Sequence, residues 1–265
     1  MLNVSHISKT FFKGTINEKK ALNDLSLTLN DGDFCTVIGG NGAGKSTLLN
    51  SIAGAYLPDS GTIEINGKDV TKMSEYKRAK FIGRVFQDPL KGTAAGMQVE
   101  ENLLLASRRG ESRRLRWAFS AGDHDKYKAM VSRLDLGLED RLSTRIGLLS
   151  GGQRQALTLL MATIKRPEVL LLDEPTAALD PKTAAKVLKI TDEIVHEQHL
   201  TTLMITHNMK DAIQTGNRLI MMHEGRIIFE VSGDEKKKLT VDDLMEKFQV
   251  AAGEEFADDQ SLLNK

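Results

Sequence analysis

The chain has 265 residues, which suffices for one large domain or for one domain with an inserted subdomain. Lysine plus arginine and aspartate plus glutamate each total 36, so the formal net charge is zero and we expect no nucleic-acid partner. Aromatic residues make up 5% of the chain, too few for the stacking platforms that single-stranded nucleic acid requires.

The N-terminus and the single cysteine bear on the cellular compartment. Residues 1–6 lack the basic start and apolar core of a secretion signal, and no run approaches the roughly 18 apolar residues of a membrane helix. Cys35 excludes an internal disulfide and fits a reducing environment. These features predict a soluble, intracellular protein whose membrane role would come through a partner.

Alternation of apolar and polar residues predicts short strands at 2–7, 25–29 and 62–65. The last of them is closed by Asn66-Gly67, a typical hairpin turn. We interpret these strands as a small antiparallel sheet packed against a nucleotide-binding core.

A glycine-rich segment follows the apolar run 34–38 and leads into a predicted helix, and we call it the phosphate loop. It fits the pattern G-x-x-x-x-G-K-[ST]. Such a strand–turn–helix aims backbone N–H groups and a positive helix end at one anion. Lys45 is predicted to reach the β- and γ-phosphates of a nucleotide, and the Ser46 hydroxyl to hold Mg²⁺. The alternative is a turn that binds nothing. The loop consists of Gly39, Gly40, Asn41, Gly42, Ala43, Gly44, Lys45, Ser46 and Thr47.

A strand is predicted over 81–86, ending at Gln87. From about 97 to 150 the sequence consists mainly of helix-forming residues with Gly and polar breaks between them. We interpret this second stretch as an inserted helical subdomain. It carries a basic cluster beside the single tryptophan, which is either a solvated helix face or a docking surface for a membrane partner or anionic lipid. The cluster consists of Arg108, Arg109, Arg113, Arg114 and Arg116, next to Trp117.

Leu149–Gln153, here called the signature segment, precedes a helix predicted over 153–165. It offers a serine hydroxyl, two glycines and a helix N-terminus, which together make a second anion site. Because one nucleotide rarely needs two phosphate cradles in one chain, we interpret the segment as serving the γ-phosphate held by another subunit. Its members are Leu149, Ser150, Gly151, Gly152 and Gln153.

The alternation of strands and helices after residue 165 predicts a mostly parallel α/β sheet with ligands at the strands' C-terminal ends. The apolar strand 169–173 ends in Asp173 and Glu174, predicted to support Mg²⁺ and to activate the attacking water. A helix capped by Asp180 follows, and then a strand over 201–206 that ends at His207. A hairpin over 218–231, a last helix opening at residue 240 and a frayed acidic tail from residue 251 complete the chain.

In order and spacing, these motifs resemble those of ATP-binding-cassette (ABC) ATPases, over roughly residues 2–232. The resemblance implies a P-loop NTPase fold of the ABC-cassette type, with a mostly parallel core sheet, an antiparallel β subdomain and an inserted helical subdomain. We expect an ABC ATPase domain over 1–232 and a C-terminal helix with a flexible acidic tail over 233–265.

The resemblance also implies roles for single residues. Phe11 would stack on adenine, with Phe12 as a neighbouring candidate, and Gln87 would touch Mg²⁺ and sense a membrane partner. His207 would contact the γ-phosphate, and Asp180 would link two active sites across a dimer. Glu174, His207 and Lys45 form the expected catalytic set. The expected Mg²⁺ ligands are Ser46, Gln87 and Asp173, and the other expected ATP contacts are Phe11, the phosphate loop, Ser150 to Gln153 and Asp180.

The implied protein is a transport-coupled ATPase at the cytoplasmic face of the membrane, which binds ATP and Mg²⁺. Two copies would close head-to-tail on two ATP molecules and power a separate permease. Residues 8–22 and 101–110 are similar to bacterial cassettes of tryptophan/tyrosine-type uptake systems, which use a solute-binding lipoprotein. The alternatives are a mechanotransmitting or lipoprotein-releasing ABC ATPase that moves no solute, and an ATPase acting on nucleic acid.

Overall fold

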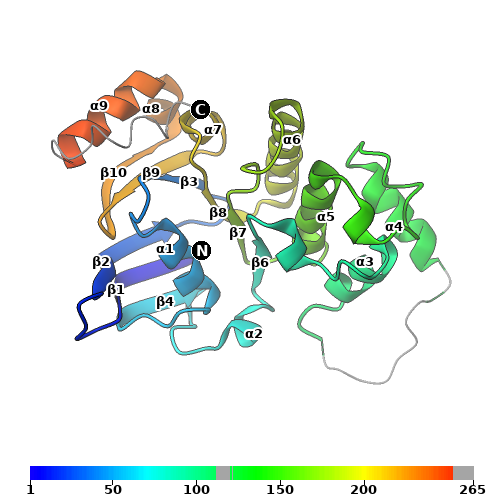
Figure 1. The fold of residues 1–265 in the computed structure, drawn as a ribbon, viewed down its shortest axis with the longest axis horizontal. Coiled ribbons are helices and arrows are strands. Elements are labelled where there is room, and N and C mark those ends of the chain that lie inside the picture. Colours follow the sequence, from blue (N-terminus) through cyan, green and yellow to red (C-terminus); the bar gives the residue numbers. More distant parts are fainter. Residues whose placement is uncertain (112–119, 121, 253–265) are drawn as a thin grey trace.

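Two β-sheets and the helices around them make up this computed structural model, which describes residues 1–111, 120 and 122–252 (Figure 1). Among those residues, six strands form one sheet in the order β10-β9-β3-β8-β7-β6, and four form another in the order β2-β1-β4-β5. The strands are β1 (Leu2–Phe11), β2 (Lys19–Leu29), β3 (Phe34–Ile38), β4 (Ser60–Ile65), β5 (Lys68–Asp69), β6 (Ile82–Val85), β7 (Val169–Asp173), β8 (Thr201–Ile205), β9 (Arg218–His223) and β10 (Arg226–Ser232).

Helices lie on both sides of the larger sheet and at its two ends (Figure 1). In the part of the chain that the structure describes, none of them is both long enough and apolar enough to cross a membrane. They are α1 (Lys45–Ala53), α2 (Glu75–Arg78), α3 (Val99–Ser107), α4 (Asp123–Ser132), α5 (Gly151–Thr163), α6 (Pro181–Gln198), α7 (Met209–Gln214), α8 (Gly233–Lys238) and α9 (Val241–Ala252), with short 3-10 turns at Pro89–Gly92 and Ile146–Leu148.

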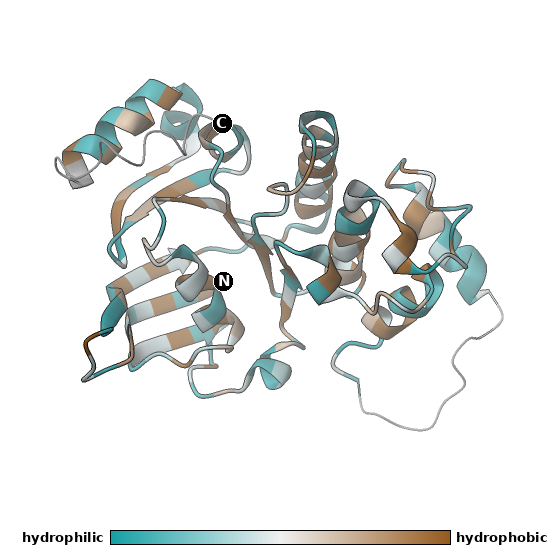
Figure 2. Ribbon diagram, viewed as in Figure 1, coloured by the Kyte–Doolittle hydropathy of each residue, from teal (hydrophilic) through white to brown (hydrophobic). Residues whose placement is uncertain are grey.

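The larger sheet is parallel from β6 to β9, and β10 is added antiparallel as the second strand of a hairpin. Its central strands β7 and β8 are buried along almost their whole length and are mostly apolar because helices cover both faces, as Figure 2 shows by the brown strands beneath them. In register, Ile205 of β8 lies beside Val37 of β3 and beside Asp173 of β7. The carboxyl ends of these three strands therefore meet at one edge.

The four-stranded sheet packs its apolar side chains over α1. Leu2, Val4 and Ile7 belong to the same buried cluster as Leu48 and Ile52 of that helix. The predicted antiparallel sheet is confirmed, but the predicted strand bounds were too short: β1 runs to residue 11 and β2 begins at residue 19. These added ends pair with each other, but the pairing has register shifts and places two buried residues, Ala21 and Leu22, next to each other, so apolar alternation could not reveal them.

Helices α3 and α4 lie at the far end of the molecule from the antiparallel sheet (Figure 1). Together with α5, α6 and one face of β7 they form a second buried cluster, whose members include Leu103, Val131, Leu157 and Leu172. The observed α4 begins at residue 123, within the stretch from about 97 to 150 that the sequence predicts to be helical. The division of the chain at residues 97, 150 and 232 remains a prediction.

Arg109 departs from the expectation of an exposed basic cluster. Its Nη1 donates to the carbonyl oxygen of Ala162 at 2.7 Å, and its Nη2 donates to that of Lys165. Burial lowers the pKa of its guanidinium. Arg109 therefore closes the C-terminal end of α5 instead of facing solvent or a membrane. Arg113, Arg114, Arg116 and Trp117 lie outside the described residues.

The C-terminal helices pack against the other end of the larger sheet. Thr240 and Asp243 form a capping pair at the start of the predicted last helix, with Thr240 N–H donating to the carboxylate at 2.8 Å and Asp243 N–H to the hydroxyl at 3.2 Å. Lys236 of α8 is buried, and its Nζ donates to the carbonyl oxygens of Thr215 and Gly216, the latter at 3.0 Å. Burial lowers the pKa of Lys236 to about 8.

Candidate nucleotide site

The phosphate loop is closely enclosed by backbone from two other strands. A Cβ atom at Gly39 would lie 2.2 Å from the carbonyl oxygen of Met222 in β9, and one at Gly44 would lie 2.4 Å from that of Ala21 in β2. Both glycines also have positive φ, 151° and 102°. Only glycine satisfies both conditions without strain, so the loop's shape is set by this packing.

Lys45 begins α1 and turns back over the loop. Its buried Nζ donates to the carbonyl oxygens of Gly39 at 2.6 Å and Gly40 at 2.9 Å, which draws the loop into a closed ring. The N-cap position of α1 is Gly44, so no side chain caps the helix there. A helix start without a side-chain cap, beside a lysine amine and the exposed Ser46 hydroxyl, suits the phosphates of a nucleotide.

Three predicted site residues from three different loops meet: two of them contact the carboxylate of the third. Gln87 Nε2 donates to Glu174 Oε2 at 2.9 Å, and His207 Nε2 lies 2.5 Å from Glu174 Oε1. These residues follow β6, β7 and β8, whose carboxyl ends meet at this edge. The Glu174 side chain is 11% exposed, whereas that of His207 is 40% exposed. The backbone φ of Glu174 is 47°, in the left-handed region, which turns the chain sharply at the end of β7.

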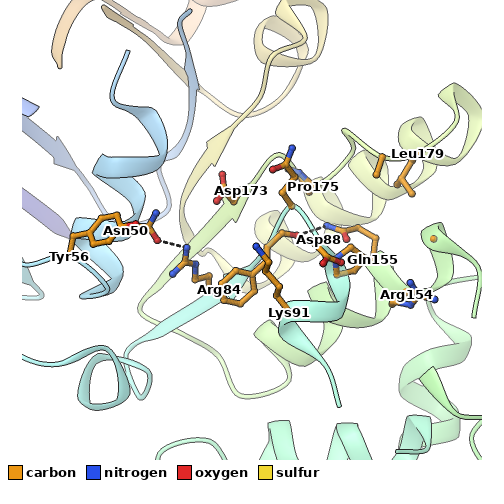
Figure 3. A pocket seen from close by; sticks show the side chains of 15 residues that line it. Asn50, Tyr56, Arg84, Asp88, Lys91, Arg154, Gln155, Asp173, Pro175 and Leu179 are labelled. Carbon is orange, nitrogen blue, oxygen red and sulfur yellow. Dashed lines mark hydrogen bonds between the residues drawn. The ribbon is translucent and has the colours of Figure 1, made fainter. Parts of the chain in front are cut away.

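Asp173 lies at the edge of a cavity of about 700 Å³ beside this cluster (Figure 3). Burial raises the pKa of Asp173; the nearby Arg84 opposes that rise, and the adjacent Glu174 carboxylate adds to it. Arg84 Nη2 donates to Asn50 Oδ1 at 2.6 Å, and Arg84 Nη1 pairs with Glu75 at 3.2 Å. A positive charge is thus fixed beside Asp173, as Figure 3 shows.

The signature segment folds as the N-cap of α5. Ser150 Oγ accepts from Gln153 N–H at 3.2 Å, and Gln153 Oε1 accepts from Ser150 N–H at 3.1 Å. Gln153 Nε2 also donates to the Leu136 carbonyl at 2.9 Å. Ser150 and Gly151 remain exposed at the surface. The segment is therefore ordered by its own capping bonds, with its N-terminal end open.

Helix α6 fixes the second signature glycine. A Cβ atom at Gly152 would lie 2.1 Å from Thr183 Cγ2 in the first turn of α6. Asp180 caps that helix by accepting from Thr183 N–H at 3.0 Å. A hydrogen bond from the Thr183 side chain is the main reason that the pKa of Asp180 is lowered, and the backbone bond adds to it. The starts of α5 and α6 are consequently locked together through Thr183.

Within one chain the signature segment does not reach the phosphate loop. The cavity of Figure 3 separates them: Asn50 and Tyr56 line one side, while Arg154 of α5 and Leu179 line the other. The structure brings Gln87, Glu174 and His207 together, but it leaves the signature segment apart from Lys45. The functional roles assigned to these residues remain predictions.

The two candidate adenine-stacking residues differ in their surroundings. The ring of Phe11, at the end of β1, packs edge-on against Tyr56 with centroids 5.2 Å apart. Phe12 is 70% exposed and has a φ of 53°. The geometry therefore holds the Phe11 ring in place and leaves Phe12 in solvent.

Arg78 supports the site from behind and was not found from the sequence. Its fully buried guanidinium donates to the carbonyl oxygens of Ser51 at 2.7 Å and Ile52 at 2.8 Å in the last turn of α1. It also donates to Met73 and Thr71 in the loop before α2, at 2.9 and 2.8 Å. Burial lowers the pKa of Arg78 to about 10. A lone arginine in a polar stretch carries no periodic signal, so burial could not be foreseen.

The chain is similar in sequence to ATP-binding proteins of transport systems. The sequence model of the ABC transporter family matches residues 22–177. A tyrosine transport ATP-binding protein of Clostridioides difficile is 43% identical over 251 residues, which is 95% of this chain and 100% of that protein. A phosphonates import ATP-binding protein of Lactococcus lactis is 32% identical over 93% of this chain and 99% of its own length.

Solved structures agree with the fold. An ATP-binding cassette of an ABC transporter in its ADP conformation superposes with a TM-score of 0.77 at 28% identity, covering 94% of this chain and 98% of that one. A dimeric ATP-binding cassette in a post-hydrolysis state with ADP and phosphate superposes with a TM-score of 0.74 at 26% identity, covering 88% and 98%.

Proposed function

This chain belongs to the ABC transporter family and is an ATPase of that family, and on that premise we propose that it is the ATP-hydrolysing subunit of an amino-acid importer. The observation that carries the proposed mechanism is the Glu174 carboxylate held between Gln87 and His207 at the carboxyl end of β7. In this assignment Glu174 orients and deprotonates the attacking water.

The chain's own residues account for the remaining steps. Lys45 and the backbone N–H groups at the start of α1 hold the β- and γ-phosphates, and His207 stabilises charge that develops on the γ-phosphate. Before the nucleotide arrives, Lys45 is already oriented by the Gly39 and Gly40 carbonyl oxygens. The site's catalytic contribution is therefore mainly positioning and electrostatic stabilisation.

Three oxygen-bearing side chains suit a magnesium ion: Ser46 is exposed at the start of α1, Gln87 lies beside Glu174, and Asp173 ends β7. When bound, Mg²⁺ would neutralise phosphate charge during transfer. Because burial raises the pKa of Asp173, a divalent cation beside it would favour the ionised carboxylate.

We assign the complete site to a homodimer in which each phosphate loop faces the partner's signature segment. Both halves are present in this chain, yet the cavity lies between Asn50 and Tyr56 on one side and Arg154 of α5 on the other (Figure 3). The dimeric cassette among the structural relatives supports this arrangement. Asp180, exposed at the start of α6, would lie near the dimer axis and connect the two sites.

Glu174→Gln tests the assigned chemistry. The variant keeps the shape of the side chain but loses the base, so we expect ATP binding to persist while turnover falls on the order of 10²- to 10⁴-fold. Steady-state phosphate release and nucleotide binding are measured on the same preparation. Unchanged hydrolysis in this variant would refute the role of Glu174.

A groove of about 450 Å³ beside β6 is the proposed permease-docking surface. It lies between the strand that leads to Gln87 and the helices α3 and α5, with Phe86, Leu105 and Met161 among its lining residues. Leu105 is 55% exposed although it is apolar, as expected of an interaction surface. Leu105→Glu should abolish co-purification with the permease while ATP binding persists, and Val250→Glu, on the distant α9, serves as the control.

The membrane partner and the solute are the finer part of the proposal. The tyrosine transport relative supports an amino-acid system. We further assign to that system a permease and an extracytoplasmic solute-binding lipoprotein, with this chain at the cytoplasmic face of the membrane. Tagged Glu174→Gln, recovered with MgATP from detergent-solubilised native membranes, should bring down both partners. Recovery of a membrane protein with large extracytoplasmic domains and no binding protein would favour the mechanical alternative.

A further inference from the structure

The C-terminal helix reaches the proposed catalytic centre through one aromatic side chain. Phe248 of α9 is 2% exposed and packs in the same cluster as Ile38 and Met209. It closes a small space that has no room for water, at the junction of β3 with the phosphate loop and of β8 with the loop that carries His207. The residues around this space are Ile38, Gly39, Thr206, His207, Met209 and Phe248.

A second contact links the same ring to the phosphate loop. Phe248 packs edge-on against the His223 ring at the end of β9, with centroids 6.1 Å apart and planes at 83°. Two residues later, Gly225 N–H donates to the carbonyl oxygen of Ala43 at 2.9 Å. The Phe248 side chain, which lies outside the proposed nucleotide site, thus lies against elements that carry the site's proposed phosphate-binding groups.

We propose that Phe248 is a positioning residue for hydrolysis, which holds His207 in its place against Glu174 and so makes turnover dependent on the docking of α9. The inference rests on the proposed role of His207. The His207 side chain is 40% exposed, so solvent does not fix its position, and Phe248 lines the same small space as His207 on the protein side.

The contact geometry indicates how turnover should respond. Without the ring, the small space that His207 lines loses its Phe248 wall, and the contact of 2.5 Å between His207 Nε2 and Glu174 Oε1 is held by less packing. A displacement of about 1 Å at a reacting group can cost up to about a hundredfold in rate. Because Lys45 is held separately by Gly39 and Gly40, the affinity for nucleotide should change little.

The experiment compares Phe248→Ala and Phe248→Leu with Val250→Ala, a control at an exposed position of the same helix. We expect Phe248→Ala to lower kcat about tenfold, within the range that misplacement produces, with the dissociation constant for MgATP changed less than twofold. Phe248→Leu should recover most of the rate by refilling the space, and Val250→Ala should match the wild type. Thermal unfolding midpoints are recorded so that rates refer to folded protein.

A double-mutant cycle with His207→Ala separates this inference from the proposed function. If Phe248 acts through His207, adding Phe248→Ala to His207→Ala lowers kcat no further. An independent tenfold loss in that background, or a Phe248→Ala variant with a lower unfolding midpoint but wild-type kcat, would overturn the positioning role alone. Unimpaired hydrolysis in His207→Ala itself would overturn the assignment of the site, and the inference with it.

Discussion

Gly152→Ala tests whether packing between α5 and α6, rather than any nucleotide, requires the second signature glycine. The new Cβ would lie 2.1 Å from Thr183 Cγ2, far inside the roughly 3.5 Å at which carbon atoms attract. Thr183 is β-branched and sits in a helix, so it has few rotamers by which to move away. Overpacking of this kind costs about 1–3 kcal/mol, from which the helix propensity of alanine recovers roughly 0.5–1 kcal/mol.

The assay is equilibrium urea unfolding of nucleotide-free protein. We expect Gly152→Ala to lower the free energy of unfolding by about 1–2 kcal/mol. Gly151→Ala is the matched control, because its Cβ would meet only the flexible end of Leu179, at 3.3 Å. Thr183→Ala removes the clashing methyl group and should restore stability to the Gly152→Ala chain in a double-mutant cycle. If Gly151→Ala and Gly152→Ala behave alike, or if Thr183→Ala restores nothing, the packing argument fails.

Three further predictions concern buried charge and adenine binding. Arg78→Met should lower the free energy of unfolding by on the order of 3 kcal/mol, because the carbonyl oxygens at the end of α1 lose their donor. An unchanged midpoint in urea unfolding would contradict this. The pKa of Lys236 is about 8 against an ordinary 10.5, so between these values the unfolded chain binds more protons and stability rises with pH. The free energy of unfolding of Lys236→Met should not show that rise with pH. If the pH profiles of the variant and the wild type run parallel, the prediction is refuted. Phe11→Leu should weaken ATP binding about tenfold in titration calorimetry, the worth of about one aromatic contact, whereas Phe12→Leu should stay within twofold; the reverse order would move the stacking role to Phe12.

Local patterns in the sequence were sufficient for most of the fold. The apolar run 169–173 and the alternation at 25–29 depend on neighbours close in the chain, so both gave strands where the structure has them. The phosphate loop was found because its spacing encodes its own turn and helix start. Strand ends were less accurate, since residues 19–24 pair irregularly with β1 and bury two successive residues, Ala21 and Leu22, which breaks the alternation.

The sequence could not give the contacts between distant segments. Nothing in the order of the chain shows that Gln87 and His207 bond to the same carboxylate, because this follows from the register of three parallel strands. Arg109 looked like part of a charged face, yet carbonyl groups at the end of α5 bind it. Phe248 was part of a helix without an assigned role, and its reach to the site depends on how α9 docks.

The backbone conformation of Glu174 has a consequence for what substitutions can do there. A side chain at a φ of 47° costs roughly 1–2 kcal/mol that glycine would not incur. The carboxylate is also mostly shielded from solvent, beside the raised-pKa Asp173. Replacing Glu174 by glycine would therefore relieve strain and like-charge repulsion together, and we expect this to offset part of the stability lost with the carboxylate's hydrogen bonds. Selection for thermal stability alone would then work against the proposed catalytic carboxylate, the usual trade-off between activity and stability.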